Sequence, residues 1–215
     1  MDDFQQQKFN DIKFEKPLFY NSSIGLRFEI GPTDIDVWAN YDKYQLNETY
    51  FNLALDRAIN IFETVFEKND NISIVYQIFS DGRRKIKKGS FIFKQIKELN
   101  TRNITFSDHR DIYSEDLNFK CECWRRVTIS GIKVHDVNYK NILNSLVNAD
   151  FGIRQPSMKG ECFFINHDKR IVLNLYDDRG MDVIAIQKQA LENLYQKHNE
   201  WILGYDKEQI DKMFS

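Results

Sequence analysis

Proline and glycine are scarce in this sequence, with three prolines and nine glycines among 215 residues. Flexible linkers and low-complexity tracts are rich in these residue types, and the chain contains neither kind of segment. A chain of this length also fits one domain of ordinary size. We therefore expect residues 1–215 to form a single domain.

Cysteine is as rare as proline, with three residues at Cys121, Cys123 and Cys162. An odd number cannot pair completely within the chain, and Cys121 and Cys123 are too close in sequence for an ordinary disulfide. Zinc sites favour two to four residues between paired cysteines, together with further ligands that are not found at a matching spacing. The sequence thus predicts reduced thiols, no metal and no cofactor.

The sequence also has no large surplus of charge of either sign, because it contains 30 basic and 32 acidic residues and its formal net charge is −2. This balance gives no general attraction to nucleic acid or to an anionic membrane, so we expect neither as a partner. No apolar run approaches the ~18 residues of a membrane span. The N-terminal Asp2 and Asp3 also stand where a signal peptide carries basic residues. These features predict a cytoplasmic protein.

Hydrophobic residues make up 42% of the chain and aromatic residues 14%, which is enough to build a substantial core. Alternation of apolar and polar residues predicts strands at residues 24–30, 72–79, 119–129, 162–165, 170–176 and 181–186. Apolar residues at three- and four-residue steps predict helices at residues 48–67, 91–99, 139–147, 191–198 and 207–214. Residues 33–47 are expected to form a long aromatic loop, and Asn47, Asp136 and Asp206 to cap helices.

The last three strands are separated by short loops, which predicts an antiparallel meander and excludes an all-parallel sheet. The expected fold class is therefore α+β. It consists of a mainly antiparallel sheet with helices packed on one face, and its late β-meander is followed by C-terminal helices. Trp201 and Tyr205 lie where these C-terminal helices close over the sheet, so we expect both side chains to be structural.

The turn between the last two strands carries the densest group of reactive side chains, Asp177-Asp178-Arg179-Gly180, followed by Asp182. A two-residue loop at 178–179 or at 179–180 places Asp177 and Asp182 each at the end of an apolar stripe of its strand. A carboxylate there needs a basic partner, which is either Arg179 or a basic side chain from elsewhere in the chain. Two carboxylates and a guanidinium at a hairpin tip can perform acid–base chemistry, hold a divalent cation or meet the charges of a partner. An ordinary charged turn, with Gly180 at positive φ and an aspartate capping the bend, explains the same residues.

This turn also carries a family resemblance. Together with the later segment Trp201-Ile202-Leu203-Gly204-Tyr205-Asp206, it resembles the uncharacterised bacterial domain-of-unknown-function family 3885, which is marked by an Asp-Asp-Arg-Gly motif and a C-terminal Trp-Ile-Leu-x-Tyr-Asp segment. Gly204 departs from the polar residue that is usual at that position. Weaker likeness at residues 17–21, 25–29 and 50–66 extends the match over most of the chain. The resemblance implies one α+β domain but no mechanism.

The sequence has no glycine-rich phosphate loop, no Gly-x-Ser-x-Gly elbow and no His-Glu-x-x-His motif, so the common catalytic families are disfavoured. We expect a non-enzymatic protein-binding module of the immunity, or toxin-neutralising, type whose partner is another bacterial protein. Asp177, Asp178, Arg179 and Asp182 are the binding candidates. Asp182 is expected to be structural, and Asp178 with Arg179 is expected to form a solvent-facing functional pair. The catalytic residues, if any, stay unknown.

The main alternative is a hydrolase or transferase acting on a phosphorylated or nucleotide-like ligand. In that case Asp177, Asp178 and Asp182 would supply acid–base or metal-binding groups, and Arg179 would clamp an anion. A third hypothesis is a ligand-sensing regulator that uses the basic run at residues 83–88 as its anion contact.

Overall fold

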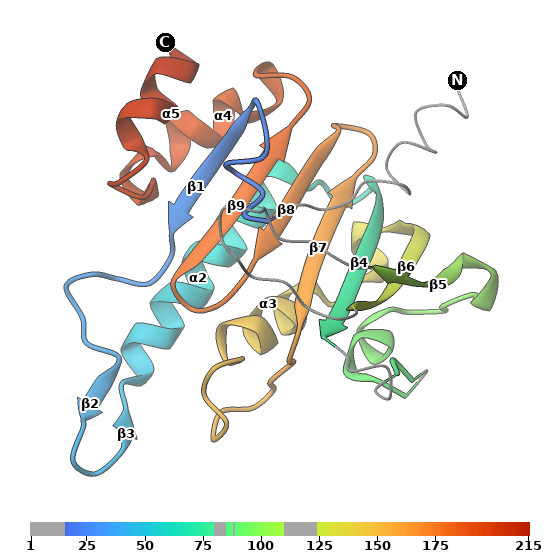
Figure 1. Ribbon diagram of the computed structural model, residues 1–215, viewed down its shortest axis with the longest axis horizontal. Helices are drawn as coiled ribbons and strands as arrows, with labels where there is room; N and C mark the ends of the chain where they lie inside the picture. The colour runs from blue at the N-terminus through green and yellow to red at the C-terminus, as the bar shows by residue number, and fades with distance from the viewer. Residues whose placement is uncertain (1–15, 80–84, 88, 110–123) are drawn as a thin grey trace.

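The computed structural model describes residues 16–79, 85–87, 89–109 and 124–215 (Figure 1). Its centre is a seven-stranded sheet in the order β1-β9-β8-β7-β4-β6-β5, and every neighbouring pair is antiparallel. The strands are β1 (Gly25–Glu29), β4 (Asn71–Phe79), β5 (Ile104–His109), β6 (Trp124–Lys133), β7 (Glu161–Asn166), β8 (Ile171–Leu175) and β9 (Gly180–Ala185). A separate hairpin pairs β2 (Trp38–Asn40) with β3 (Gln45–Leu46).

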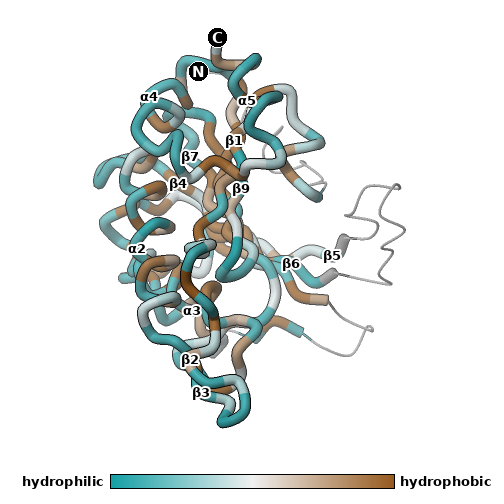
Figure 2. The backbone as a smooth tube through the Cα atoms, turned by 90° about the vertical axis from the view of Figure 1, so that its left-hand side faces the viewer, coloured by the Kyte–Doolittle hydropathy of each residue, from teal (hydrophilic) through white to brown (hydrophobic). Residues whose placement is uncertain are grey.

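The helices are α2 (Glu48–Val65), α3 (Tyr139–Val147), α4 (Gln189–Lys197) and α5 (Lys207–Phe214). Short 3-10 helices are η1 (Phe91–Gln95), η2 (Thr101–Asn103), η4 (Val134–Asp136) and η5 (Asn199–Trp201). Figure 2 shows α2, α3 and α4 on one side of the strands. The expected α+β fold is therefore confirmed: a mainly antiparallel sheet is covered by helices on one face, and the β7-β8-β9 meander precedes the C-terminal helices.

Helix α2 shows why this layer forms. The side chain of Asn47 accepts a hydrogen bond from the backbone N–H of Thr49, as its predicted capping role requires. Apolar side chains at helical spacing then face the sheet, and the buried residues of the helix are Tyr50, Phe51, Ala54, Ala58, Ile61, Phe62 and Val65. These residues belong to one large hydrophobic cluster with the inward side chains of β4, β7, β8 and β9. Helix formation and core formation thus depend on the same apolar stripe.

Several local predictions differ from the structure. The expected aromatic loop contains the β2–β3 hairpin, and β5 was not predicted. Helix α3 is capped by Asn138, whose side chain accepts from the N–H of Asn141, and Asp136 instead ends η4. The Asp206 side chain makes no cap, because its carboxylate accepts the hydroxyl of Tyr20 from a distant segment. The helix predicted at residues 91–99 is reduced to the short 3-10 helix η1 at residues 91–95.

The C-terminal aromatic residues divide into two environments. Trp201 is half-buried, stacks on His198 at a centroid distance of 4.5 Å and packs against the core. Tyr205 is 87% exposed, so the prediction that it is structural is wrong. Its segment is held to the sheet by the neighbouring Ile202, which bridges to Phe28, and by the N–H of Leu203, which donates to Arg27.

Two sequence features concern residues outside the part that the structure describes. Cys121 and Cys123 lie there, as do Arg83, Arg84 and Lys88 of the basic run. The third cysteine, Cys162, is a free thiol buried on β7. Within the described ranges, no helix is both long enough and apolar enough to cross a membrane.

Phe62 offers a test of the core. Its fully buried ring stacks on Phe66 and Tyr139 at 4.3 Å each and meets Phe164 edge-on at 5.1 Å. We expect Phe62→Ala to lower the free energy of unfolding by about 3–5 kcal/mol, because the removed ring leaves a cavity that its neighbours cannot fill. Urea denaturation measures this loss, and the half-exposed Phe106 of β5 provides the control. Equal losses for Phe62→Ala and Phe106→Ala would show that the core is elsewhere.

Candidate functional site

The β8–β9 turn is one residue longer than predicted. Leu175 pairs with Met181, and the N–H of Tyr176 donates to the carbonyl of Gly180 at 3.3 Å. The loop therefore has three residues, 177–179, and not two. The turn is also tied to β1, because the Arg179 carbonyl accepts the N–H of Ile30 at 2.9 Å. The motif thus occupies a fixed place beside the end of β1.

Asp177 holds Arg179 in place. One carboxylate oxygen, Oδ1, accepts the backbone N–H of Arg179 at 2.8 Å, and the other accepts its guanidinium Nε at 3.0 Å and Nη2. The Asp177 side chain is buried, whereas the Arg179 side chain is 72% exposed. Hydrogen bonding and the charge of Asp177 raise the pKa of Arg179 further above its ordinary value. Asp177 thus caps the bend and presents a guanidinium in a fixed orientation to solvent.

Asp178 points inward. Its side chain is only 3% exposed, and its Oδ2 accepts the hydroxyl of Tyr50, in the first turn of α2, at 2.8 Å. Burial raises the pKa of the Asp178 carboxyl, and the hydrogen bond from Tyr50 opposes that shift. Burial and the nearby carboxylate raise the pKa of Tyr50 in turn. The prediction of a solvent-facing Asp178 is wrong, because this side chain links the turn to the helix layer.

Two glycines are required by close approach. A Cβ atom on Gly180 would lie 2.3 Å from the Tyr176 hydroxyl oxygen, and one on Gly31 would lie 2.4 Å from that of Tyr50. The described glycines at positive φ are Gly131 and Gly160. The expectation of positive φ at Gly180 is therefore wrong. The motif needs glycine because a tyrosine ring packs directly on the backbone.

Asp182 faces the side of the sheet that α2, α3 and α4 leave open. It pairs in register with Arg27 of β1 and Asn174 of β8, and it is 1% exposed. Its Oδ2 accepts the N–H of Phe19 at 3.2 Å, and its Oδ1 lies 3.7 Å from Nε of Arg27. Burial raises the pKa of Asp182 to about 6, against the opposing effect of Arg27. The basic partner that this carboxylate needs thus comes from β1 and not from the turn.

Arg27 is held by aromatic rings on both sides. Its guanidinium carbon lies 5.0 Å from the ring centre of Tyr20 and 5.8 Å from that of Tyr176. Its Nε is also 3.9 Å from Oδ2 of Asp206, which ties the C-terminal segment to the same cluster. A guanidinium in this setting gains from the ring quadrupoles as well as from the two carboxylates. The cluster joins β1, β9 and the N- and C-terminal segments.

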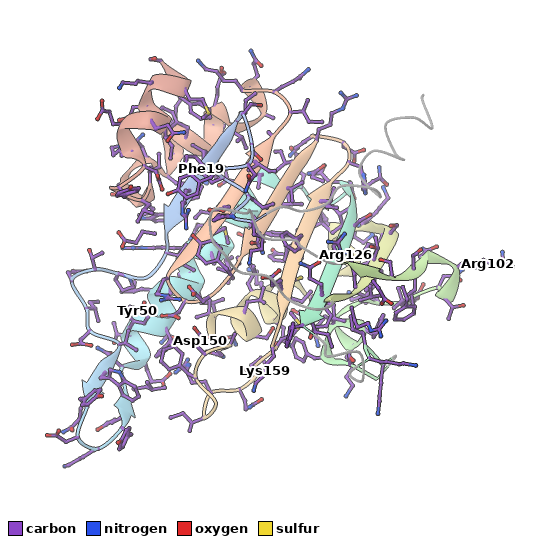
Figure 3. The ribbon with its side chains drawn as sticks, in the orientation of Figure 1. Phe19, Tyr50, Arg102, Arg126, Asp150 and Lys159 are labelled. Carbon is purple, nitrogen blue, oxygen red and sulfur yellow. The ribbon has the colours of Figure 1, made fainter. Side chains whose placement is uncertain are left out.

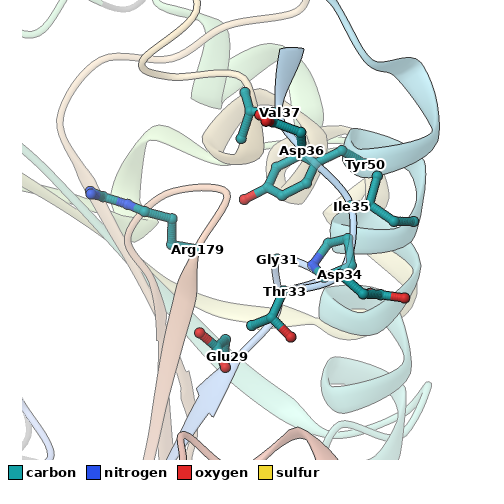
Figure 4. Close-up of a pocket in the computed structure, with 10 residues that line it drawn as sticks. Glu29, Gly31, Thr33, Asp34, Ile35, Asp36, Val37, Tyr50 and Arg179 are labelled. Atoms are coloured by element: carbon teal, nitrogen blue, oxygen red, sulfur yellow. The ribbon is translucent and has the colours of Figure 1, made fainter. Parts of the chain in front are cut away.

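A pocket of about 540 Å³ lies on the other side of the turn (Figure 4). Arg179, Tyr50, Glu29 and residues 31–37 line it. Arg57 of α2 braces part of the segment that lines it, because Nη1 of Arg57 lies 3.4 Å from the carbonyl oxygens of Glu29, Ile30 and Gly31. Of the predicted site residues, Arg179 thus lines the pocket. Asp177 binds Arg179, and Asp178 binds Tyr50, which also lines the pocket. Asp182 is on the opposite face of the sheet and does not contribute.

The pocket adjoins a group of exposed aromatic side chains on the β2–β3 hairpin. Tyr41 is 69% exposed and Tyr44 is 72% exposed, and they pack edge-on against the half-buried Trp38 at centroid distances of 5.7 and 6.2 Å. The hairpin projects from the body of the molecule at the lower left of Figure 1, and Figure 3 shows Tyr50 at the same end. Tyr44 has a φ of 51°, a conformation that tyrosine rarely adopts. We call the hairpin residues Trp38, Tyr41 and Tyr44 the aromatic tip.

Sequence reasoning overlooked the pocket residues Tyr50, Glu29, Asp34 and Asp36. Tyr50 lies within the helix predicted at residues 48–67, but its hydroxyl gave no separate signal. Asp34 and Asp36 lie in the segment taken for a plain loop, although carboxylates alternating with apolar residues beside Gly31-Pro32 were a visible signal. Asp178 and Asp182 lie on opposite sides of the sheet, so they cannot act on one ligand. Throughout the described ranges, no group of three or more histidine, cysteine, aspartate or glutamate residues is placed to hold a metal ion.

Comparison with known proteins supports the family resemblance. A family model described as a domain of unknown function (DUF3885) matches residues 1–206. The uncharacterised protein YnaE of Bacillus subtilis (strain 168) is 26% identical over 212 residues, which cover 93% of this chain and 95% of that protein. No solved structure matches significantly.

The contact between Gly180 and Tyr176 predicts a coupled pair of substitutions. We expect Gly180→Ala to lower the free energy of unfolding by about 1–3 kcal/mol, because the added methyl group overlaps the tyrosine ring. In a Tyr176→Ala background the same change should cost less, since the ring is gone. A double-mutant cycle by urea denaturation measures the difference. Additive effects would contradict the proposed reason for the glycine.

Asp182 predicts a pH dependence of stability. Its pKa of about 6 in the folded protein lies above the ordinary value of 3.8, so the folded state binds this proton more tightly than the unfolded state. The contribution of this group to stability is therefore fully present below about pH 4 and is lost as the pH rises through about 6. Asp182→Asn should flatten the stability profile in this range, as measured by unfolding at a series of pH values. An unchanged profile in the variant would assign the titration to another group.

Proposed function

The chain belongs to the DUF3885 family, and we propose that it is a non-enzymatic protein-binding module of the toxin-neutralising immunity type, with another bacterial protein as its partner. The proposed interface consists of the aromatic tip, the adjoining pocket and the guanidinium of Arg179. Asp177 and Asp178 belong to it indirectly, since they hold Arg179 and the pocket wall. Asp182 lies on the opposite face of the sheet and takes no part in this interface.

The observation that carries this proposal is the exposure of Tyr41 and Tyr44 on a projecting hairpin beside the pocket. Tyrosine, tryptophan and arginine are enriched among the residues that dominate binding energy at protein interfaces. All three residue types occur on this surface, at Tyr41, Tyr44, Trp38 and Arg179. An aromatic side chain also brings a large contact area at a low cost in conformational entropy.

The backbone of Tyr44 supports the same proposal. A left-handed conformation costs a residue with a Cβ roughly 1–2 kcal/mol, and glycine or asparagine relieves that cost in most hairpins. Tyr44 keeps a large side chain at a φ of 51°, although that side chain is largely exposed and adds little to the core. Such strain is often found where a side chain serves binding. Tyr44 thus fits a residue retained for its contact with another molecule.

The turn motif contributes rigidity. Asp177 fixes the Arg179 guanidinium through Oδ2 and the Arg179 backbone N–H through Oδ1, and Asp178 anchors the same turn to α2 through Tyr50. A side chain that is already fixed loses little conformational freedom on binding, which favours affinity. The motif therefore supplies a preorganised rim to the pocket.

The aromatic tip can be tested by substitution. We expect Tyr41→Ala and Tyr44→Ala each to weaken binding to the purified product of the neighbouring gene by at least about 1–2 kcal/mol, because each removes a central aromatic contact. Isothermal titration calorimetry measures the change. The matched control is Tyr205→Ala, which removes an equally exposed tyrosine outside the proposed interface.

A loss of affinity as large in the control as in the tip variants would contradict the proposed interface.

The toxin-neutralising role is tested separately, by bacterial growth. Expression of the neighbouring gene alone should arrest growth, and co-expression with this chain should restore it. Turnover of a phosphate ester that disappears in Arg179→Ala would instead favour an enzyme.

A further inference from the structure

We infer that the partner is basic and presents arginine or lysine side chains to the pocket and the aromatic tip. This inference rests on the proposed function and names the chemistry that this surface recognises. Its basis is the charge of the pocket wall, the free faces of the two exposed tyrosines, and the neutralised state of Arg179.

The pocket wall carries uncompensated negative charge. Glu29, Asp34 and Asp36 line it, and none of them forms an ion pair with any residue that the structure describes. Asp34 and Asp36 are exposed and Glu29 is half-buried. The three negative charges of these carboxylates are larger in sum than the net charge of −2 of the whole chain. A concave surface lined by one sign of charge concentrates its field and attracts the opposite sign.

Arg179 does not cancel this charge. Its guanidinium is bound to Asp177 through two of its nitrogen atoms, and the charge of Asp150 also acts on it. An anion entering the pocket would therefore meet three carboxylates that form no ion pair with the described residues, and a cation that is already paired. A guanidinium or ammonium group would instead be attracted by the three carboxylates of the wall, and guanidinium also matches carboxylates in bidentate geometry.

The aromatic tip adds a second kind of contact for a cation. Inside the molecule, guanidinium groups lie over several aromatic rings, such as Arg154 at 3.9 Å from Phe51 and Arg57 at 5.6 Å from Trp201. Within the described ranges, no cation lies over Tyr41 or Tyr44, and neither hydroxyl has a hydrogen-bond partner. Exposed tyrosine faces beside carboxylates form a setting in which a cationic side chain gains from both.

A titration with small probes tests the pocket without knowledge of the partner. N-acetyl-argininamide and inorganic phosphate are added separately to the full chain labelled with nitrogen-15, and amide shifts are followed by NMR. We expect the arginine probe to shift amides at residues 29–50, with a response that weakens at least threefold between about 50 and 300 mM salt. Phosphate should leave these amides unchanged. Shifts at the pocket with phosphate and not with the arginine probe would overturn the inference.

Charge-matched variants exclude a general electrostatic effect. Asp34→Asn combined with Asp36→Asn removes two charges from the wall, while asparagine at position 36 can still accept the N–H of Trp38. We expect this variant to bind the arginine probe at least fivefold more weakly. The control combines Glu98→Gln and Glu200→Gln, which removes two charges from exposed residues outside the pocket and should change binding less than twofold. Equal losses in both variants would overturn the inference.

The two proposals can fail separately. If the protein partner binds, depends on Tyr41 and Tyr44, and is insensitive to salt and to the Asp34/Asp36 variant, the partner is not basic and only this inference fails. If the arginine probe binds as expected while no protein partner depends on the aromatic tip, the proposed function fails and the pocket recognises small cations instead.

Discussion

A carboxylate buried in a protein must have hydrogen-bond donors, and the bond from Tyr50 to Asp178 supplies one where three separate segments meet. Asp178 belongs to the β8–β9 turn, Tyr50 to α2, and Gly31, packed against the same hydroxyl, to the segment after β1. The position of the pocket wall follows from this contact, since Gly31 begins the wall and Arg179 closes it. The orientation of Arg179 follows as well, because Asp177 is the neighbouring residue of the same turn.

The sheet uses its two faces differently. The covered face is apolar and joins the helices in one large cluster. The open face carries a smaller apolar cluster around Phe163, together with the charged group of Arg27 and Asp182. Segments from both ends of the described chain reach that group through Phe19 and Asp206. Buried charge therefore adds to apolar burial in placing the terminal segments, while apolar burial places the helices.

The periodicity of the apolar residues and the short loops between the predicted strands were enough to predict most of this architecture. The three late strands, helix α2 and the cap at Asn47 follow from local patterns that tertiary contacts reinforce. The failures have a common physical cause. Asp206, Asp178 and Tyr50 all have their roles decided by a partner far away in sequence, and a local pattern carries no information about such partners. The polar pocket was missed because it forms only when the turn, α2 and residues 31–37 come together.

One side chain joins the two segments that mark the family. The guanidinium of Arg57 lies against the carbonyl oxygens beside the Asp-Asp-Arg-Gly turn and at the same time over the ring of Trp201, in the Trp-Ile-Leu-x-Tyr-Asp segment. A planar guanidinium with several donors suits both neighbours better than the compact ammonium of lysine. A lineage that loses the tryptophan also loses the surface that orients this arginine, so we expect positions 57 and 201 to change together in evolution.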